Sequence, residues 1–397
     1  MVPALRKAYN DAFTKENYQA FLHELEALHP GQLDFRVCET PVFVSNEFKS
    51  KMLDACESII DLICSPSFKS MTQSAIPAKE NVPNEYPHAH MIAFDFGVCS
   101  NASGELEPQL IEMQGFPSLF AYQCAYPDLL RKYFPIPDNQ TQFLSGYTKE
   151  TFIEQFRKII IGNHVPEEVI LLELKPETQK TRIDFAFTRD YTGVETVCIT
   201  NLIREGSKLY YEKAGQKIQI KRIYNRLIFD DLKSNAASLP PFIDITDALD
   251  VEWIPHPNWF YRISKYTLPF IHHAYVPETW FLNEIKQLPK DLENYVLKPL
   301  FSFAGQGVKI DVTTAALEAI EDPENYILQR KVNYAAAVET PDDPAKVEIR
   351  LMYLWPEGKE RPHAAINLAR LSKGKMVGVR YNKDKEWVGG SVAFFEK

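Results

Sequence analysis

A lone lysine in an apolar, strand-like run leads directly into a small loop that contains glycine. The run is YVLKPLFSFAGQGV, at positions 295–308. The two-residue period of a strand places Val296, Lys298 and Leu300 on one face. The loop at 304–307 can bring backbone N–H groups close to phosphate oxygens, with the ammonium of Lys298 over the anion. This unit predicts a phosphate site; the alternative is an ordinary strand lysine beside a tight turn.

Composition places the chain among globular proteins. Its 397 residues are 45% hydrophobic and 24% charged, which is enough for two or three compact lobes and excludes disordered and fibrous classes. The net charge of −9 and the pI near 5.6 argue against a nucleic-acid-binding or anionic-membrane-binding protein, because such proteins gather Lys and Arg. A bound phosphate must therefore be held by a few local cations.

Three further features predict a cytoplasmic location. The six cysteines occur without a CxxC pair or zinc-like spacing, so we expect reduced thiols. The first residues, MVPALRKAYNDAF, lack the charged, apolar and small-residue regions of a signal peptide. The sequence contains no run of about 18 apolar residues, so we do not expect a membrane span. The sequence does not define an oligomeric state.

Apolar periodicity divides the chain into four predicted regions. Positions 1–87 form a helical support region, in which apolar residues recur at helical spacing: Leu22, Leu25, Leu28, Met52, Ile59, Ile60 and Ile63. Positions 88–146 carry a β-hairpin and its connection. Positions 147–250 form a small parallel α/β lobe, with a helix at 147–160 followed by the strands EEVILLEL and VETVCIT. Positions 251–397 form the nucleotide lobe, and the fold class is α+β, a mixed α/β architecture.

The hairpin MIAFDFGVCSNASGELEPQLIEMQG carries three oxygen-bearing side chains. A turn at 101–104 places Asp95 opposite Glu112, and the strand period puts Glu112 and Gln114 on one face. Such hard oxygen donors suit Mg²⁺ that bridges nucleotide phosphates. The alternative is a pair of solvated carboxylates, but Asp95 stands between two phenylalanines, so a buried environment is expected.

In their order along the chain, these segments resemble the synthetase domain of bacterial glutathionylspermidine synthetase and its circularly permuted ATP-grasp relatives. In an ordinary ATP-grasp enzyme the nucleotide-binding lysines precede the metal carboxylates, whereas here the acidic hairpin precedes the lysine strand. The resemblance covers positions 88–397 and implies an ATP-grasp-like, circularly permuted fold. It implies that Asp95, Glu112 and Gln114 hold Mg²⁺, with Gln114 in place of an Asn. Ala93 stands where the family has a substrate-contacting Arg.

The resemblance also implies contacts to ATP in three later segments. They are HPNWFYRISKYTLPFI, whose lysine precedes an apolar helix; the lysine strand and its loop, which match a phosphate flap; and ENYILQRKV, which matches the strand and hinge that line adenine. The residues so assigned are Lys265, Lys298, Gly305, Gln306, Gly307, Gln329, Lys331 and Val332.

Near the end, the resemblance extends to the segment VGVRYNKDKEWVGGSVAFF. It implies that Arg380 contacts the phosphate or the transition state, and Tyr381 stands in place of the family's Glu. Arg350 and Arg370 are further candidates, with pairing to an acid as the alternative. The substrate side of the cleft is assigned to basic and acidic side chains for which surface salt pairs are the alternative: Lys175, Arg182, Arg222, Arg226, Asp230 and Asp231.

The sequence and the resemblance together predict an ATP-dependent carboxylate–amine ligase that forms an amide through an acyl phosphate, without an amidase activity. ATP and Mg²⁺ are the expected cofactors, and a small carboxylate and an amine are the expected substrates. Lys298 and Arg380 are the expected catalytic residues. Nucleic acid and membrane are not expected partners. The alternatives are a phosphotransferase on the same scaffold and a noncatalytic nucleotide-binding protein.

Overall fold

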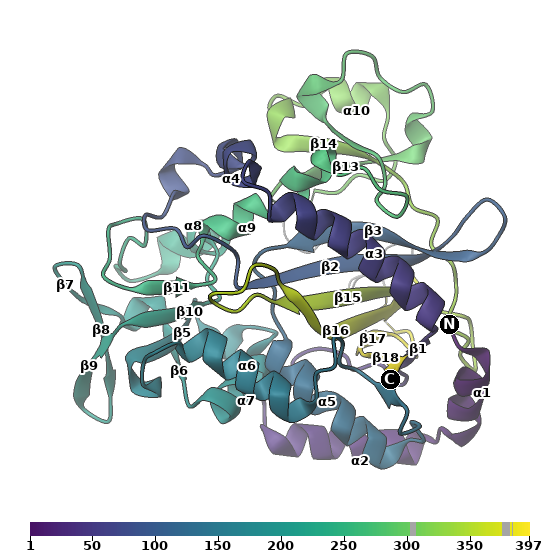
Figure 1. The fold of residues 1–397 in the computed structure, drawn as a ribbon, viewed down its shortest axis with the longest axis horizontal. Helices are drawn as coiled ribbons and strands as arrows, with labels where there is room; N and C mark the ends of the chain where they lie inside the picture. The colour runs from purple at the N-terminus through teal and green to yellow at the C-terminus, as the bar shows by residue number, and fades with distance from the viewer. Residues whose placement is uncertain (302–306, 375–381, 383) are drawn as a thin grey trace.

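A five-stranded antiparallel sheet forms the centre of the molecule (Figure 1). The strands follow the spatial order β17–β16–β15–β2–β3, so strands from both halves of the chain are neighbours. Their bounds are β2 Met91–Ser100, β3 Leu106–Gln114, β15 Lys346–Leu354, β16 His363–Ser372 and β17 Gly389–Ser391. The computed structural model describes residues 1–301, 307–374, 382 and 384–397. The mixed α/β class is confirmed, and the boundaries of the four regions stay predictions.

The N-terminal region is helical, as its apolar spacing predicts. Its helices are α1 Pro3–Ala12, α2 Lys15–Leu28, α3 Asn46–Ile63 and α4 Phe68–Met71. The side chains of Thr14 and Ser45 cap α2 and α3 by accepting backbone N–H groups. This region does not stand apart, because β1 (Val42–Val44) pairs in parallel with β18 (Ala393–Glu396), which pairs with β4 (Gln140–Thr141).

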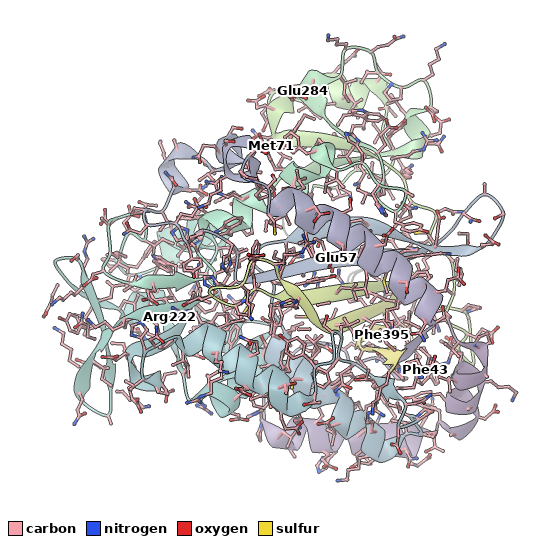
Figure 2. The ribbon with its side chains drawn as sticks, viewed as in Figure 1. Phe43, Glu57, Met71, Arg222, Glu284 and Phe395 are labelled. Atoms are coloured by element: carbon pink, nitrogen blue, oxygen red, sulfur yellow. The ribbon has the colours of Figure 1, made fainter. Side chains whose placement is uncertain are left out.

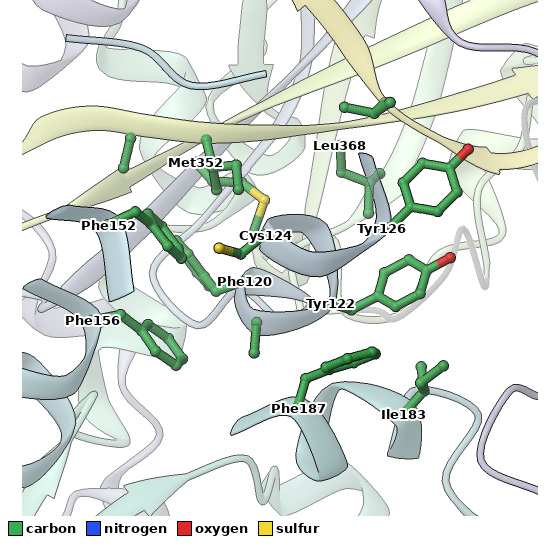
Figure 3. Packing of buried hydrophobic residues seen from close by; sticks show 14 of the residues in the cluster. Phe120, Tyr122, Cys124, Tyr126, Phe152, Phe156, Ile183, Phe187, Met352 and Leu368 are labelled. Carbon is green, nitrogen blue, oxygen red and sulfur yellow. The ribbon is translucent and has the colours of Figure 1, made fainter. Parts of the chain in front are cut away.

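Hydrophobic side chains cover both faces of the central sheet. On one face, α3 packs over apolar residues of β2 such as Phe94. On the other face, α5 (Phe120–Tyr133) and α6 (Lys149–Ile161) pack toward Met352 and Leu368 (Figure 3). The sheet is therefore buried on both sides over much of its area, and a charged side chain that points from it needs a partner.

A parallel sheet has three of its four strands within the region predicted at 147–250, and its fourth strand follows at 252–254. Its strand order is β11–β10–β5–β6, and every neighbouring pair is parallel. Its elements are β5 Val169–Glu173, α7 Arg182–Thr192, β6 Glu195–Cys198, β10 Arg222–Asn225 and β11 Glu252–Ile254. The predicted helix at 147–160 is α6, which starts after a capping box of Thr148 and Thr151. An antiparallel sheet is inserted between β6 and β10; its strands are β7 Ile203–Glu205, β8 Lys208–Lys213 and β9 Gln216–Ile220.

The third lobe contains the lysine strand. Its antiparallel sheet has the order β12–β14–β13, with bounds β12 Thr279–Phe281, β13 Tyr295–Pro299 and β14 Tyr326–Arg330. The remaining α-helices are α8 Phe229–Asn235, α9 Asn258–Arg262 and α10 Thr314–Glu318. In Figure 1, α10, β13 and β14 lie together beyond the edge of the central sheet that β3 forms. Among the described helices, none is long and apolar enough to cross a bilayer.

Candidate functional site

The hairpin of β2 and β3 has the register that the sequence predicts. Asp95 lies directly opposite Glu112. The amide nitrogen of Gln114 donates to Oε1 of Glu112 at 2.8 Å, so these two side chains share a face. The turn is held by Asn101, whose Oδ1 accepts two backbone N–H groups of the turn. The three predicted oxygen donors are therefore neighbours, and their function as metal ligands stays a prediction.

Asp95 forms a buried ion pair with Arg350, its cross-strand neighbour on β15. Nε of Arg350 donates to Oδ1 at 2.5 Å and Nη2 donates to Oδ2 at 2.6 Å. Only 1% of the Asp95 side chain is exposed. Burial is the largest single influence and raises the pKa of Asp95. The guanidinium groups of Arg350 and Arg370, with a hydrogen bond to Glu112, together lower it by more, so this pKa lies below its usual value. The negative charge of Asp95 is therefore already paired with a guanidinium group.

A second guanidinium reaches the same carboxylate. Nη2 of Arg370 lies 3.0 Å from Oδ2 of Asp95 and 3.0 Å from Oε2 of Glu348. Glu348 also accepts the hydroxyl hydrogen of Tyr334. Burial raises the pKa of Glu348, and Arg370 opposes this rise. Of the two alternatives for Arg350 and Arg370, pairing with an acid is the one observed. We call Asp95, Glu348, Arg350 and Arg370 the guanidinium cluster.

Lys298 joins the third lobe to the hairpin. Its Nζ donates to the backbone carbonyl of Ile111 on β3 at 3.0 Å and to Oε1 of Gln329 on β14 at 2.6 Å. Gln329 in turn donates its amide to the hydroxyl of Thr279 at 3.0 Å. Burial lowers the pKa of Lys298 to about 8, although Glu112 opposes this shift. The strand prediction is confirmed, and the lysine is buried beside the acidic hairpin.

Lys265 approaches the carboxylate of Glu112 from another segment of the chain. It starts the 3-10 helix η7 (Lys265–Phe270), and 7% of the residue is exposed. Burial lowers the pKa of Lys265, and the charge of Glu112 opposes the shift. The backbone N–H of Gly115 donates to the carbonyl of Ile263 at 2.9 Å, which ties this segment to the end of β3. The alternative of a surface lysine on an amphipathic helix is wrong.

Positive charge exceeds negative charge at this site. Among the residues that the structure describes, the ionisable side chains that meet there are Asp95, Glu112, Glu348, Lys265, Lys298, Arg350 and Arg370. Three acids and four bases give a net charge of +1 when every group is ionised. A site of this kind favours an anion over a cation.

The donor set only partly fits the Mg²⁺ that the resemblance implies. Asp95 does not fit as a ligand in this arrangement, since both of its oxygens accept guanidinium N–H groups. Glu112 is accessible, with 29% of its side chain exposed, and Glu112 and Gln114 offer the oxygen atoms that Mg²⁺ prefers. Across residues 1–301, 307–374, 382 and 384–397, no three His, Cys, Asp or Glu side chains are grouped to hold a metal ion.

Of the other residues assigned to ATP, Gly307, Lys331 and Val332 belong to the described part of the chain. Gly307 has φ +73, and a Cβ there would come 2.7 Å from Cγ of Pro299, so the position requires glycine. Strand β14 ends before Lys331 and Val332, and Nζ of Lys331 donates to the backbone carbonyl of Glu293. The contact of these two residues with adenine stays a prediction. Gly305, Gln306 and Arg380 lie outside the described residues.

Sequence reasoning did not find Glu348, Tyr334 or Thr279. The two-residue spacing of Glu348 and Arg350 in EIRLMYLW places both side chains on one face of β15, which is a signal that a polar patch interrupts a buried strand. Tyr334 and Thr279 carry no such signal, because their partners come from other strands.

Two of the six residues predicted on the substrate side form salt pairs. Arg222, on β10 of the parallel lobe (Figure 2), donates Nη2 at 2.6 Å to Glu357, which follows β15 of the central sheet. Arg182 pairs with Asp34 at 2.7 Å. The salt-pair alternative is therefore correct for these two residues. Arg226 differs, because its Nη1 donates to the carbonyl of Pro117 at 2.7 Å, in the segment that follows β3.

Polar groups gather at the carboxyl ends of two parallel strands beside Arg226. Glu173 ends β5 and Asn225 ends β10. Burial raises the pKa of Glu173 to about 8, and the backbone N–H of Leu174 opposes this shift. Within the described residues, Nδ2 of Asn225 and Nε of Arg226 are buried and have no hydrogen-bond partner. Ligands of open α/β sheets bind at such carboxyl ends.

Comparison with known proteins supports the fold. The sequence matches no family model and no curated protein. Among solved structures, the chain is similar to a glutathione synthetase-like effector from Globodera pallida in its apo form, with 11% sequence identity and a TM-score of 0.55. The match covers 97% of this chain and 98% of that chain. At this identity the similarity concerns the fold alone: the chain has a mixed α/β fold similar to that of a glutathione synthetase-like protein.

Proposed function

We propose that this chain is an ATP-dependent ligase that joins a carboxylate to an amine, on an ATP-grasp-like, circularly permuted fold. One observation carries the proposal: Nζ of Lys298 lies 3.0 Å from the carbonyl of Ile111, the residue before Glu112. The late lysine strand and the early acidic hairpin therefore face one site, as a shared triphosphate would require. Similarity of the fold to a glutathione synthetase-like protein supports the same class.

The lysines of this site would offset the charge of the phosphates. Lys298 and Lys265 are both buried and have lowered pKa values, so a bound anion would stabilise their charged forms. Gln329 orients the ammonium of Lys298 through its side-chain oxygen. Mg²⁺ that accompanies ATP would shield phosphate charge, and Glu112 and Gln114 are the side chains proposed to hold it.

The proposed reaction has two steps. A carboxylate oxygen of the substrate attacks the γ-phosphorus, the bond to the β-phosphate oxygen breaks, and ADP leaves. The amine nitrogen then attacks the acyl carbon of the acyl phosphate, phosphate departs with the electron pair of the C–O bond, and the nitrogen loses a proton. The protein positions the reactants and stabilises charge, a function that we assign to Lys298 and Arg380. A protein nucleophile is not needed.

We place the substrates at the carboxyl ends of β5 and β10. Arg226 there carries a buried Nε without a hydrogen-bond partner in the described part of the chain, and Asn225 carries a buried amide of the same kind. Both are suited to a carboxylate or amide group of a substrate. Arg226 also contacts the segment after β3, which brings this edge next to the hairpin that carries Glu112.

A noncatalytic nucleotide-binding protein is the second candidate. It is favoured by Asp95, whose two oxygens are both taken by Arg350, because a ligase of this class would be expected to use that carboxylate in catalysis. Such a protein would bind ATP at the same lysines without transferring its phosphate.

Two measurements separate these functions. In calorimetry, Lys298→Met is expected to weaken ATP binding at least about tenfold, or by about 1.4 kcal/mol. Lys286→Met, which removes an exposed lysine of the same lobe, is expected to leave it unchanged. Amine-dependent ADP release is then measured with a panel of carboxylates and amines, with mass spectrometry of the products. An amide supports the ligase, and a released phosphorylated carboxylate supports a phosphotransferase. Binding without turnover supports the noncatalytic protein, and no ATP binding removes all three.

A further inference from the structure

We infer that the guanidinium groups of Arg350 and Arg370 take the place of a divalent cation at Asp95, so that the protein binds no metal ion through this carboxylate. The inference deepens the proposed function and rests on it only for the identity of the anion bound at the site. Three N–H groups reach the two oxygens of Asp95, at 2.5, 2.6 and 3.0 Å. Charge-assisted hydrogen bonds of this number satisfy a carboxylate without a metal.

The central sheet fixes Arg350 in this position. It is the register partner of Asp95, and β15 and β2 each have a hydrogen-bonded strand on both sides. The side chain of Arg350 is 9% exposed. Turning it away would leave the buried carboxylate of Asp95 with one guanidinium hydrogen bond, that from Arg370, which is unfavourable. A metal ion would have to break this pair before it could reach Asp95.

Arg370 is held by a second acid. Its Nη2 lies 3.0 Å from Glu348 as well as 3.0 Å from Asp95. Tyr334 donates its hydroxyl to Glu348, which fixes that carboxylate in turn. Each buried acid of the guanidinium cluster therefore has its own cation, and the polar groups orient one another.

The surrounding charge also opposes a divalent cation that arrives without the phosphates of a nucleotide. Lys298 and Lys265 both interact with Glu112, so the carboxylate outside the guanidinium cluster is matched as well. A divalent cation would add to a site whose net charge is already +1 when every group is ionised, whereas a polyphosphate would offset it.

Binding of Mn²⁺ to nucleotide-free protein, measured by electron paramagnetic resonance of the free ion, tests the inference. The wild type is expected to bind with a Kd no tighter than about 1 mM, and Asp95→Asn is expected to bind equally weakly. Arg350→Met is expected to bind at least about tenfold more tightly than the wild type, because Asp95 and Glu112 then lack a cation between them. The double variant Asp95→Asn/Arg350→Met is expected to lose this gain.

Arg361→Met is the matched control. Arg361 holds Asp61 at 2.6 Å and Glu57 at 2.7 Å, but these acids are 68% and 53% exposed on α3. Removal of this guanidinium frees two solvated carboxylates, so no comparable gain is expected. An equal gain in Arg361→Met would overturn the inference, because any pair of released acids would then suffice.

If Arg350→Met does not fold, Mn²⁺ binding by the wild type and by Asp95→Asn tests the inference. Wild-type binding tighter than about 1 mM that Asp95→Asn abolishes overturns the inference, and binding that Asp95→Asn leaves unchanged supports it. The proposed function is tested apart from this, by ATP titration in Mg²⁺ and in EDTA. Lack of ATP binding in both solutions removes the proposed function, while the Mn²⁺ result still decides the inference.

Discussion

Arg350 is the cross-strand partner of Asp95, and its Nε and Nη2 lie 2.5 and 2.6 Å from the two oxygens of that carboxylate. A buried ion pair contributes little when compared with two apolar residues of similar volume, because both ions lose their hydration. Removal of one partner alone is far more damaging, because it leaves the other charge buried and unmatched.

Asp95→Asn is therefore expected to lower the free energy of unfolding by about 3–5 kcal/mol. The double variant Asp95→Leu/Arg350→Met is expected to lose less than this single change. Urea unfolding followed by circular dichroism measures both. Arg361→Met, which breaks an exposed pair, is expected to change stability by about 1 kcal/mol or less. A double variant at least as unstable as Asp95→Asn would contradict the coupling.

Lys298 gives a pH dependence with a defined sign. Its pKa is about 8 in the folded chain and about 10.4 when unfolded, so between these values the unfolded chain holds a proton that the folded chain lacks. The free energy of unfolding should therefore rise with pH across this window, by at most about 1.4 kcal/mol per pH unit. Below about pH 8 both states are protonated, and the cost of burying the ammonium is fully present.

The measurement is the difference in urea stability between the wild type and Lys298→Met at about pH 8 and about pH 10. This difference isolates one lysine from the tyrosines, which ionise near the upper limit. A difference that does not vary with pH would show that Lys298 keeps its ordinary pKa.

Glu173 should give the opposite slope. Its pKa is about 8 in the folded chain, against about 4.3 when unfolded, so between these values the folded chain holds a proton that the unfolded chain has lost. Stability is then highest below about pH 4.3 and falls as pH rises to about 8.

Glu173→Gln removes this titration and keeps a neutral group of similar size. We expect the variant to gain stability relative to the wild type between about pH 5 and about pH 8 in thermal unfolding. A gain of the same size at about pH 5 and at about pH 8 would mean that Glu173 is already ionised in the folded protein near neutral pH.

Gly115 is a site where one methyl group should disturb the candidate site. A Cβ there would clash with the backbone oxygen of Trp259 and lie 3.0 Å from Cβ of Ile263. Gly115→Ala is therefore expected to push the segment of Lys265 away from the end of β3, and to lower both stability and ATP affinity. Gly390→Ala is the control, since its Cβ meets Phe35 at an ordinary 3.5 Å. Equal effects of the two changes would contradict the prediction.

The hairpin could be predicted because its information is local. The turn at 101–104 and the two-residue period fix which residues face one another, and Asp95 does lie opposite Glu112. The buried strand of Lys298 was predictable for the same reason, since apolar neighbours surround a single charge. These features depend on short segments whose alternation survives in any fold.

The partners of the charged residues could not be predicted. Arg350 was assigned either a phosphate or an acid, and only the adjacency of β15 and β2 selects Asp95. The apolar helix expected after Lys265 is a 3-10 helix with Pro269 inside it, because proline cannot supply the N–H that an α-helix requires. Pairings between distant strands depend on tertiary packing, which the spacing of one segment does not encode.

The parallel pairing of Val42–Val44 with Ala393–Glu396 also has a consequence for how the chain is made. During synthesis the backbone of the first strand stays unpaired until positions 393–396 have left the ribosome. Closure of so long a loop is slow compared with the formation of local helices. We therefore expect this protein to reach its native state only after translation has passed those positions, and to depend until then on protection of that edge from aggregation.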